Sequence, residues 1–145
     1  MLKYQLPLRL IISVLAGIII AMVLSVITHE ILHQAGIFPA LGKPMFDTRL
    51  LWISLSYHSL YALIAAYFTA MIAEKKAKKA TFILGTKEAI MWLLGTLLLW
   101  QHAAPWYNIT KALLGVPIAM LGGEIYARHR LKKSSMLKVS QGLNN

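Results

Sequence analysis

Long apolar runs alternate with short polar or basic segments along the whole chain. A helix rises about 1.5 Å per residue, so about 20 residues cross the roughly 30 Å hydrocarbon core of a bilayer. Because backbone groups in lipid must be hydrogen-bonded internally, runs of this length form helices. The pattern predicts four spans, at about 8–28, 50–73, 81–100 and 106–126. Residues 1–133 are thus expected to form an all-α, antiparallel four-helix transmembrane bundle, followed by a polar, disordered tail at 134–145.

The third and fourth spans contain charged residues. The uncharged stretch after Lys87 and Glu88 is too short to cross alone, so the third span must include 81–88, with Lys87 reaching back toward the headgroups. Lys111, near the start of the fourth span, is expected to reach toward the opposite headgroups. If one of these two spans were absent, the number of crossings would be odd. The basic cluster at 128–133 would then lie outside, against the positive-inside rule.

Lysine and arginine also predict the orientation. They concentrate in the N-terminus, in the loop after the second span and in the tail: Lys3, Arg9, Lys75, Lys76, Lys78, Lys79, Arg128, Arg130, Lys132, Lys133 and Lys138. Cytoplasmic loops carry such an excess, so both termini are expected in the cytoplasm and segments 29–49 and 101–105 outside. Aromatic residues near the outer interface fit this orientation: Trp52, Tyr57, Trp100, Trp106 and Tyr107.

Composition narrows the class of protein. The 145 residues, enough for one domain, are 58% hydrophobic and 14% charged, whereas soluble domains carry about 25% charged residues. The net charge of +10 does not indicate nucleic acid, because the basic residues flank apolar runs, where they meet anionic headgroups. We expect the bilayer of the cell's inner (plasma) membrane as the partner. The absence of cysteine excludes disulfides, iron–sulfur clusters and thiol catalysis.

Small residues recur at every fourth position in three of the predicted spans. They form three stripes: Gly17 and Ala21; Ala62, Ala66 and Ala70; Gly115, Ala119 and Gly123. Small residues let helices approach closely in lipid. The stripes therefore predict packing within the bundle, with a homo-oligomer or another membrane protein as the alternative partner.

The segment His29-Glu30-Ile31-Leu32-His33 matches the H-E-x-x-H pattern of zinc peptidases. On a helix, two histidines four apart can bind one zinc ion, and Glu30 would be the catalytic candidate that activates a metal-bound water. A catalytic zinc needs a third ligand, and Asp47, the only aspartate, lies in a context unlike that of intramembrane peptidases. A peptidase is therefore the less favoured interpretation.

A broader metal site is a second hypothesis. Four of the five histidines map to the outer part of the predicted bundle: His29, His33, His58 and His102. Imidazole suits zinc or another transition metal, although the spacing fixes no ligand set. The alternative is that these polar-tipped rings simply favour the interface.

Ionisable groups inside spans are a third source of candidates. Glu88 and Glu124 could mark an ion or proton path, because charges inside a membrane are costly and often functional. The alternative is neutralisation in pairs, since Arg128 follows Glu124 by four residues and Lys87 is adjacent to Glu88.

Several short apolar motifs resemble those of uncharacterised small bacterial membrane proteins with four predicted spans. The motifs are Ala70-Met71-Ile72-Ala73 before the basic loop, Ile83-Leu84-Gly85, Trp106-Tyr107, Pro117 with Leu121-Gly122-Gly123, and Phe38-Pro39 after the histidine segment. The resemblance implies a fold and a membrane location, and no activity.

Three classes of function follow from the sequence. The favoured one is a structural, accessory or partner-binding membrane subunit without enzymatic activity. The alternatives are a small transporter or ion-path module that uses Glu88 and Glu124, and a metal-dependent site at the outer histidines. A transporter is expected to show broken helices in paired positions, and only Pro117 interrupts a predicted span.

Overall fold

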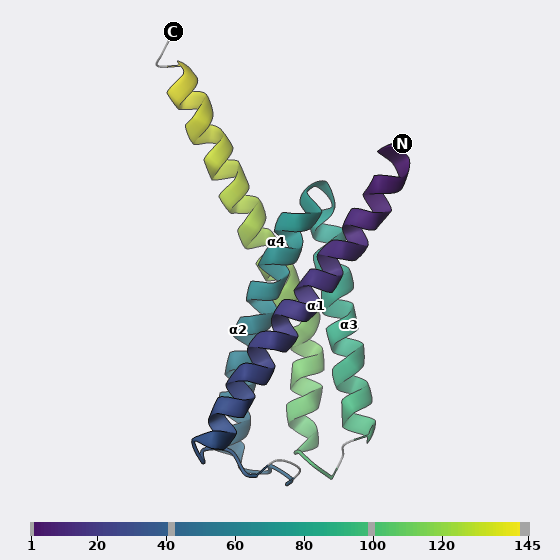
Figure 1. The fold of residues 1–145 in the computed structure, drawn as a ribbon, viewed down its shortest axis with the longest axis vertical. Coiled ribbons are helices and arrows are strands. Elements are labelled where there is room, and N and C mark those ends of the chain that lie inside the picture. The colour runs from purple at the N-terminus through teal and green to yellow at the C-terminus, as the bar shows by residue number, and fades with distance from the viewer. Residues whose placement is uncertain (1, 41–42, 99–100, 143–145) are drawn as a thin grey trace.

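The protein is all-α, as the sequence predicts. A computed structural model describes residues 2–40, 43–98 and 101–142, and the predicted interface residue Trp100 lies outside them. The described elements are α1 (Leu2–Gln34), α2 (Thr48–Ala73), the single 3₁₀ turn η1 (Glu74–Lys76), α3 (Ala77–Leu98) and α4 (Pro105–Gly142) (Figure 1). The N-terminal part of α1, η1 and the C-terminal part of α4 lie at one end of the molecule, and segments 35–40 and 43–47 lie at the other.

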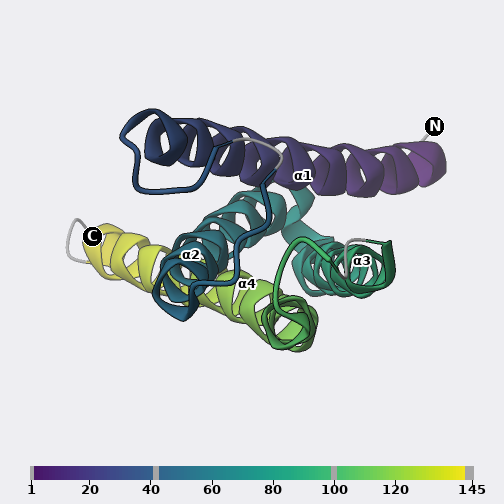
Figure 2. The same ribbon diagram turned by 90° about the horizontal axis from the view of Figure 1, so that it is seen from below.

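The helices do not form a regular four-helix bundle. α4 packs against both α2 and α3, and α1 packs chiefly against α2. Seen along the long axis, α1 lies across the other three helices as a separate layer (Figure 2). The structure thus has a three-helix core of α2, α3 and α4, with α1 as an oblique cover.

Three helical segments of the described chain are long and apolar enough to cross a membrane: Leu8–Gln34, Thr48–Leu98 and Pro105–Met136. The sequence predicts four spans, so the count differs. The reason is that α2, η1 and α3 follow one another without a non-helical residue between them and form the second segment together. Figure 1 shows that this segment folds back on itself at η1.

Glu74 makes the reversal at η1. Its φ of 47° is the one positive value that a non-glycine residue adopts in the described chain, and the backbone there leaves the helical course of α2. Arg9 of α1 fixes the turn from outside: its Nη2 lies 2.7 Å from Glu74 Oε1, and its Nε donates to the Ile72 carbonyl at 2.8 Å. The basic loop is thereby tied to the N-terminal part of α1.

Glycines permit the closest helix contacts in the core. A Cβ on Gly85 of α3 would lie 2.8 Å from Val116 Cα and 2.9 Å from the Gly115 carbonyl oxygen of α4. A Cβ on Gly122 would lie 2.6 Å from the Leu63 carbonyl oxygen of α2. Because backbone atoms cannot move aside as a flexible side chain can, only glycine fits these positions.

The predicted small-residue stripes serve these same contacts. Ala66, Ala70 and Ala119 are almost completely buried within the chain. A Cβ on Gly17 of α1 would overlap the Thr69 hydroxyl, at the point where α1 crosses α2. Packing within the bundle thus accounts for residues that could otherwise have indicated a homo-oligomer.

Local capping explains where the helices begin and end. The Asp47 carboxylate accepts a hydrogen bond from the Arg49 amide at 2.8 Å, which starts α2. α1 continues through the histidine segment to Gln34, six residues beyond the predicted span, and Gly36 then takes a left-handed φ of 69°. α4 runs on to Gly142, into the tail for which the sequence predicts disorder.

Many large apolar side chains are exposed on the outer surface. Exposed side chains of α1 include Leu8, Ile11, Ile12, Leu15, Ile19, Met22, Val23, Val26, Ile27 and Ile31, and Leu97, Leu98 and Leu113 on α3 and α4 are more than 70% exposed. Water-soluble monomers rarely expose contiguous apolar patches of this extent. The polar groups of greatest interest are therefore those inside the bundle.

Candidate functional site

Lys111 points into the bundle. The sequence predicts that it reaches toward the headgroups, but its side chain is 5% exposed and lies between α3 and α4. Its ammonium Nζ donates to the Tyr107 hydroxyl at 2.9 Å and sits 3.2 Å from the ring centroid of Trp92. The prediction is wrong because Lys111 falls on the inward face of α4, four residues before Gly115.

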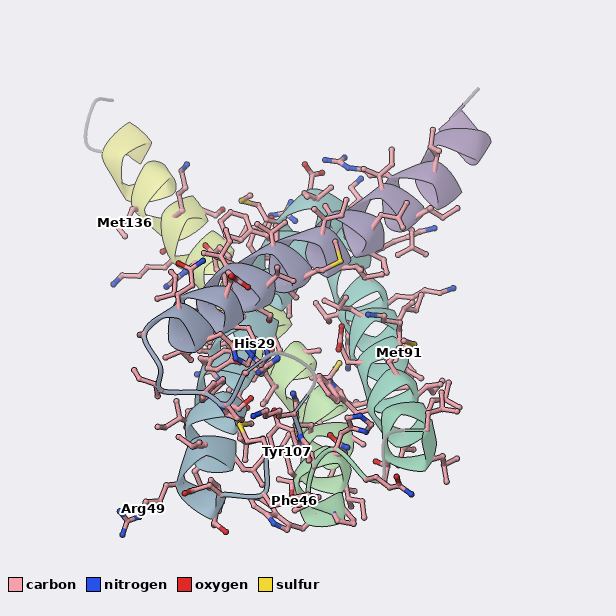
Figure 3. The ribbon with its side chains drawn as sticks, turned by 60° about the horizontal axis from the view of Figure 1, so that its bottom comes forward. His29, Phe46, Arg49, Met91, Tyr107 and Met136 are labelled. Carbon is pink, nitrogen blue, oxygen red and sulfur yellow. The ribbon has the colours of Figure 1, made fainter. Side chains whose placement is uncertain are left out.

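Tyr107 connects this lysine to α2. Its ring is 6% exposed, and its hydroxyl hydrogen-bonds to the Ser54 hydroxyl. The His58 Nδ1 donates to the Ser54 backbone carbonyl at 2.8 Å, which places the proton of a neutral ring on Nδ1, since a carbonyl can only accept. Figure 3 shows Tyr107 projecting from α4 and His29 from α1. A continuous polar cluster thus joins α2 and α4 within the core.

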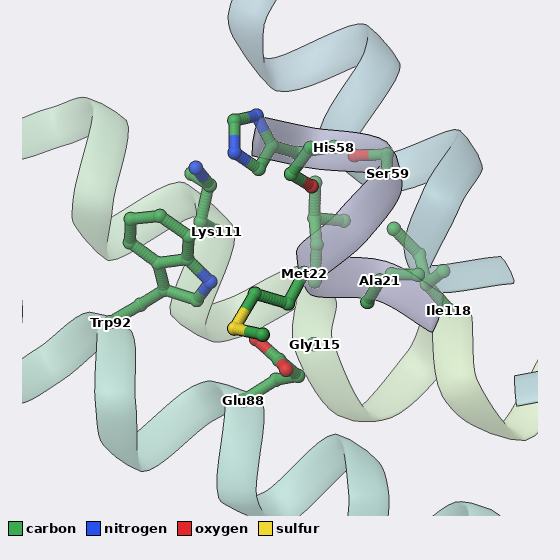
Figure 4. A pocket seen from close by; sticks show the side chains of 12 residues that line it. Ala21, Met22, His58, Ser59, Glu88, Trp92, Lys111, Gly115 and Ile118 are labelled. Carbon is green, nitrogen blue, oxygen red and sulfur yellow. The ribbon is translucent and has the colours of Figure 1, made fainter. Parts of the chain in front are cut away.

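A cavity of about 180 Å³ lies beside this cluster, and all four α-helices line it. We call it the lysine cavity. Its lining is Ala21, Met22 and Ser25 of α1; His58, Ser59 and Ala62 of α2; Glu88 and Trp92 of α3; and Lys111, Leu114, Gly115 and Ile118 of α4. Figure 4 shows Lys111 beside Trp92, with His58 and Ser59 on one side and Glu88 on another. The wall combines apolar surface with a few convergent polar groups, as small-molecule sites do.

The carboxylate of Glu88 is paired. Lys87 Nζ lies 2.8 Å from Glu88 Oε1, with the two side chains 36% and 22% exposed. Among the described residues, no carboxylate lies within ion-pair distance of Lys111. The cavity is therefore lined by the carboxylate of one neutralised pair and by one buried lysine without a carboxylate partner among the described residues.

Glu124 does not share this site. It accepts a hydrogen bond from Arg128 Nε at 3.0 Å on the surface of α4, as the four-residue spacing predicts. Glu88 lies level with Gly115, where a Cβ would approach the Glu88 Cβ to 3.5 Å. Glu124 follows Gly115 by nine residues, a rise of about 14 Å along the helix. The structure thus does not bring together the two glutamates of the hypothetical ion path.

The histidines of the H-E-x-x-H segment contact each other. Their Nε2 atoms are 3.0 Å apart, and His29 Nδ1 lies 3.2 Å from the Tyr57 hydroxyl. The Glu30 carboxylate accepts a hydrogen bond from Gln34 at 2.9 Å on the exposed side of α1. Asp47, the remaining acidic candidate, caps α2. The segment is helical as predicted, but Glu30 faces away from the bundle and from the two rings.

A complete metal site is not assembled in this part of the molecule. Within residues 2–40, 43–98 and 101–142, no three His, Asp or Glu side chains lie close enough together to hold an ion. His58 belongs to the Tyr107 cluster, and His102 contributes its backbone carbonyl to Met45 at 2.8 Å. The four candidate ligands thus separate into a contacting pair, His29 and His33, with His58 in the Tyr107 cluster and His102 beside Met45.

The sequence contains a signal for the lysine cavity that periodicity alone could have revealed. Tyr107 and Lys111 continue, at the same four-residue spacing, the stripe of Gly115, Ala119 and Gly123. Residues four apart share a helix face, so a stripe that packs inward places Tyr107 and Lys111 inward as well. Tyr107 is therefore buried inside the bundle, whereas Trp52 is 55% exposed and packs against Trp106.

Comparison with protein-family models, with curated proteins and with solved structures finds no match to this chain. The resemblance to small bacterial four-span proteins therefore stays a prediction. The argument for function depends on the geometry of the lysine cavity.

Proposed function

We propose that the chain is an integral protein of the plasma membrane that crosses the bilayer four times, with both termini in the cytoplasm. The reversal at η1 supports two crossings by segment Thr48–Leu98, since its 51 helical residues exceed the length that one crossing needs. The termini and the basic η1 turn lie at the same end (Figure 1), as an even number of crossings and the positive-inside rule require.

Labelling of single cysteines tests the crossings, since the chain contains none of its own. Four crossings protect Ser135→Cys from an impermeant maleimide added to intact cells and expose Ala40→Cys. With the N-terminus in the cytoplasm, three crossings would place Ser135 outside together with Ala40, and Ser135→Cys would react with the maleimide. Both residues are exposed on the surface, so protection reports on the membrane side and not on burial.

We further propose that the bundle binds a small polar molecule in the lysine cavity. The observation that supports this function most strongly is Lys111, a lysine buried inside the bundle that lines a cavity of about 180 Å³. A bundle selected only for packing gains nothing from such a group, because an uncompensated charge inside a membrane protein is costly. Buried ionisable groups inside membranes ordinarily mark a binding site or a pathway.

The reactivity of introduced cysteines also tests whether a water-soluble molecule can reach the lysine cavity. Ser59→Cys, which lines the cavity, should react with a small water-soluble methanethiosulfonate reagent on the purified protein. Ser13→Cys is the matched control, since Ser13 is fully buried away from the cavity and should stay unmodified. If the two variants prove equally inert, the cavity is closed and a purely structural role replaces the proposed one.

A further inference from the structure

The charges around the lysine cavity are unbalanced. Lys87 and Glu88 neutralise each other at 2.8 Å, and the His58 Nδ1 donates to the Ser54 carbonyl. Lys111, at 5% exposure, is the basic side chain of the lining that has no carboxylate partner among the described residues. An occupant that carries one negative charge would complete the site.

The partners that Lys111 already has leave room for such an occupant. An ammonium has three N–H donors. One is used by the Tyr107 hydroxyl at 2.9 Å, and the face of the Trp92 ring takes a second, at 3.2 Å from its centroid. The remaining donor belongs to a group that lines the cavity. A hydrogen bond from this donor to an oxyanion would be charge-assisted and therefore strong.

The remaining wall fits a small oxyanion with an apolar end. The hydroxyls of Ser25 and Ser59 line the same space and can donate to a second oxygen. Met22, Leu114 and Ile118 supply apolar surface around them. The volume of about 180 Å³ suits a group of a few heavy atoms and not a large metabolite.

Resting on the proposed ligand-binding function, we infer that the lysine cavity binds a singly charged oxyanion, with the Lys111 ammonium as its counter-ion. Tyr107 and Trp92 position this ammonium, and the Lys87–Glu88 pair keeps the opposite wall neutral. Two sources supply this chemistry: a short carboxylate from water, or the phosphodiester of a lipid headgroup.

Trp92 is a built-in reporter because its ring contacts the Lys111 ammonium. The test titrates acetate, acetamide and acetamidinium, three compounds of one shape that carry charges of −1, 0 and +1, against the purified protein in detergent. Acetate should change the tryptophan fluorescence, acetamide should bind about tenfold or more weakly, and acetamidinium should give no response. The Trp92→Phe variant identifies the share of the signal that comes from the cavity.

A separate titration with phosphatidylglycerol in the same micelles distinguishes the sources. A response to acetate assigns the site to a free carboxylate, and a response to the lipid alone assigns it to a headgroup phosphate. In either case Lys111→Met should abolish the response, while Ser56→Ala, a change on the exposed side of α2 outside the cavity lining, should preserve it.

The outcomes separate the inference from the function on which it rests. Equal or stronger binding of acetamide or acetamidinium would overturn the inference and leave the ligand-binding function standing. Acetate binding that survives in a folded Lys111→Met variant would overturn it as well. If that variant does not fold, the three compounds on the unmodified protein still decide. No response to any of the four compounds would overturn the inference, and an inert Ser59→Cys would then remove the proposed function too.

Discussion

The two ends of the α3–α4 contact differ in how closely the helices pack and in how polar their side chains are. Toward η1, Gly85 meets Gly115 and Ala119 so closely that a single added carbon would overlap backbone atoms. Away from η1, Trp92 of α3 faces Tyr107 and Lys111 of α4, and a cavity of about 180 Å³ remains between the helices. The same two helices therefore form a rigid contact at one end and a polar chamber at the other.

This difference separates stability from function. Close contacts between small residues stabilise helix pairs in lipid through packing, whereas a buried ammonium beside empty space opposes stability. The close-packed end holds the two helices in register. The open end can therefore contain Lys111, a side chain that does not improve the packing. Four predictions test this division: the first perturbs the close-packed end, the next two perturb the open end, and the fourth perturbs a surface ion pair that serves as a reference.

The largest effect is expected at the close-packed end. Gly85→Val should lower the free energy of unfolding by about 3 kcal/mol, because the added side chain meets backbone atoms that cannot give way. Gly95→Val on the same helix is the control: no atom lies within 4 Å of a Cβ there, and the change should be within about 0.5 kcal/mol. Thermal unfolding in detergent measures both, and equal losses would contradict the packing account.

A smaller loss is expected at the Tyr107 hydroxyl. Tyr107→Phe removes the acceptor at 2.9 Å from the Lys111 ammonium and should lower the free energy of unfolding by about 2 kcal/mol. Tyr61→Phe removes a neutral hydrogen bond to Thr28 at 2.7 Å and should lower it by about 1 kcal/mol. If both variants lose the same stability in chemical denaturation, Tyr107 does not support a charge.

The contact between Lys111 and Trp92 should be measurable as a coupling energy. Trp92→Leu should lower the free energy of unfolding by about 1 kcal/mol more in the unmodified protein than in a Lys111→Met background. A double-mutant cycle isolates this difference from the loss of the indole surface. A coupling of zero would mean that the ring serves only as a cavity wall.

A surface ion pair provides the weakest effect and a reference for the buried charge. Glu74→Gln breaks the contact with Arg9, whose side chain is 51% exposed, while Glu74 is 43% exposed. The loss should be below about 1 kcal/mol and should vanish at high salt, because exposed charges are screened. A loss that persists at high salt would show that this pair does more than join two surface groups.

The sequence predicts the apolar helices correctly because length and hydropathy determine them locally. It misses the merging of α2 and α3 into one helical segment, because a basic run such as Lys75–Lys79 is usually read as a loop, and here part of it is helical. It also misses the oblique course of α1, which follows from where Gly17 permits α1 to cross α2. Such crossing geometry depends on two partners and is not contained in either helix alone.

In the candidate site, too, the sequence predicts contacts within one helix but not contacts between helices. The pairing of Glu124 with Arg128 is local to one helix, and its spacing predicts it. The placement of Lys111 depends on which face of α4 turns inward, and considering its distance from the helix end alone gives the wrong answer. Combining the lysine with the small-residue stripe on its own helix would have placed it correctly, whereas the cavity itself needs side chains from four helices.

The three-residue turn η1 also constrains how the protein is made. α3 carries the Lys87–Glu88 pair in its middle, which makes its entry into a bilayer costly. Because only Glu74–Lys76 separates it from α2, the two helices under the four-crossing proposal must leave the translocation machinery as one hairpin. The apolar α2 then carries its charged neighbour into the membrane, and the lysine cavity can close only when α4 arrives last.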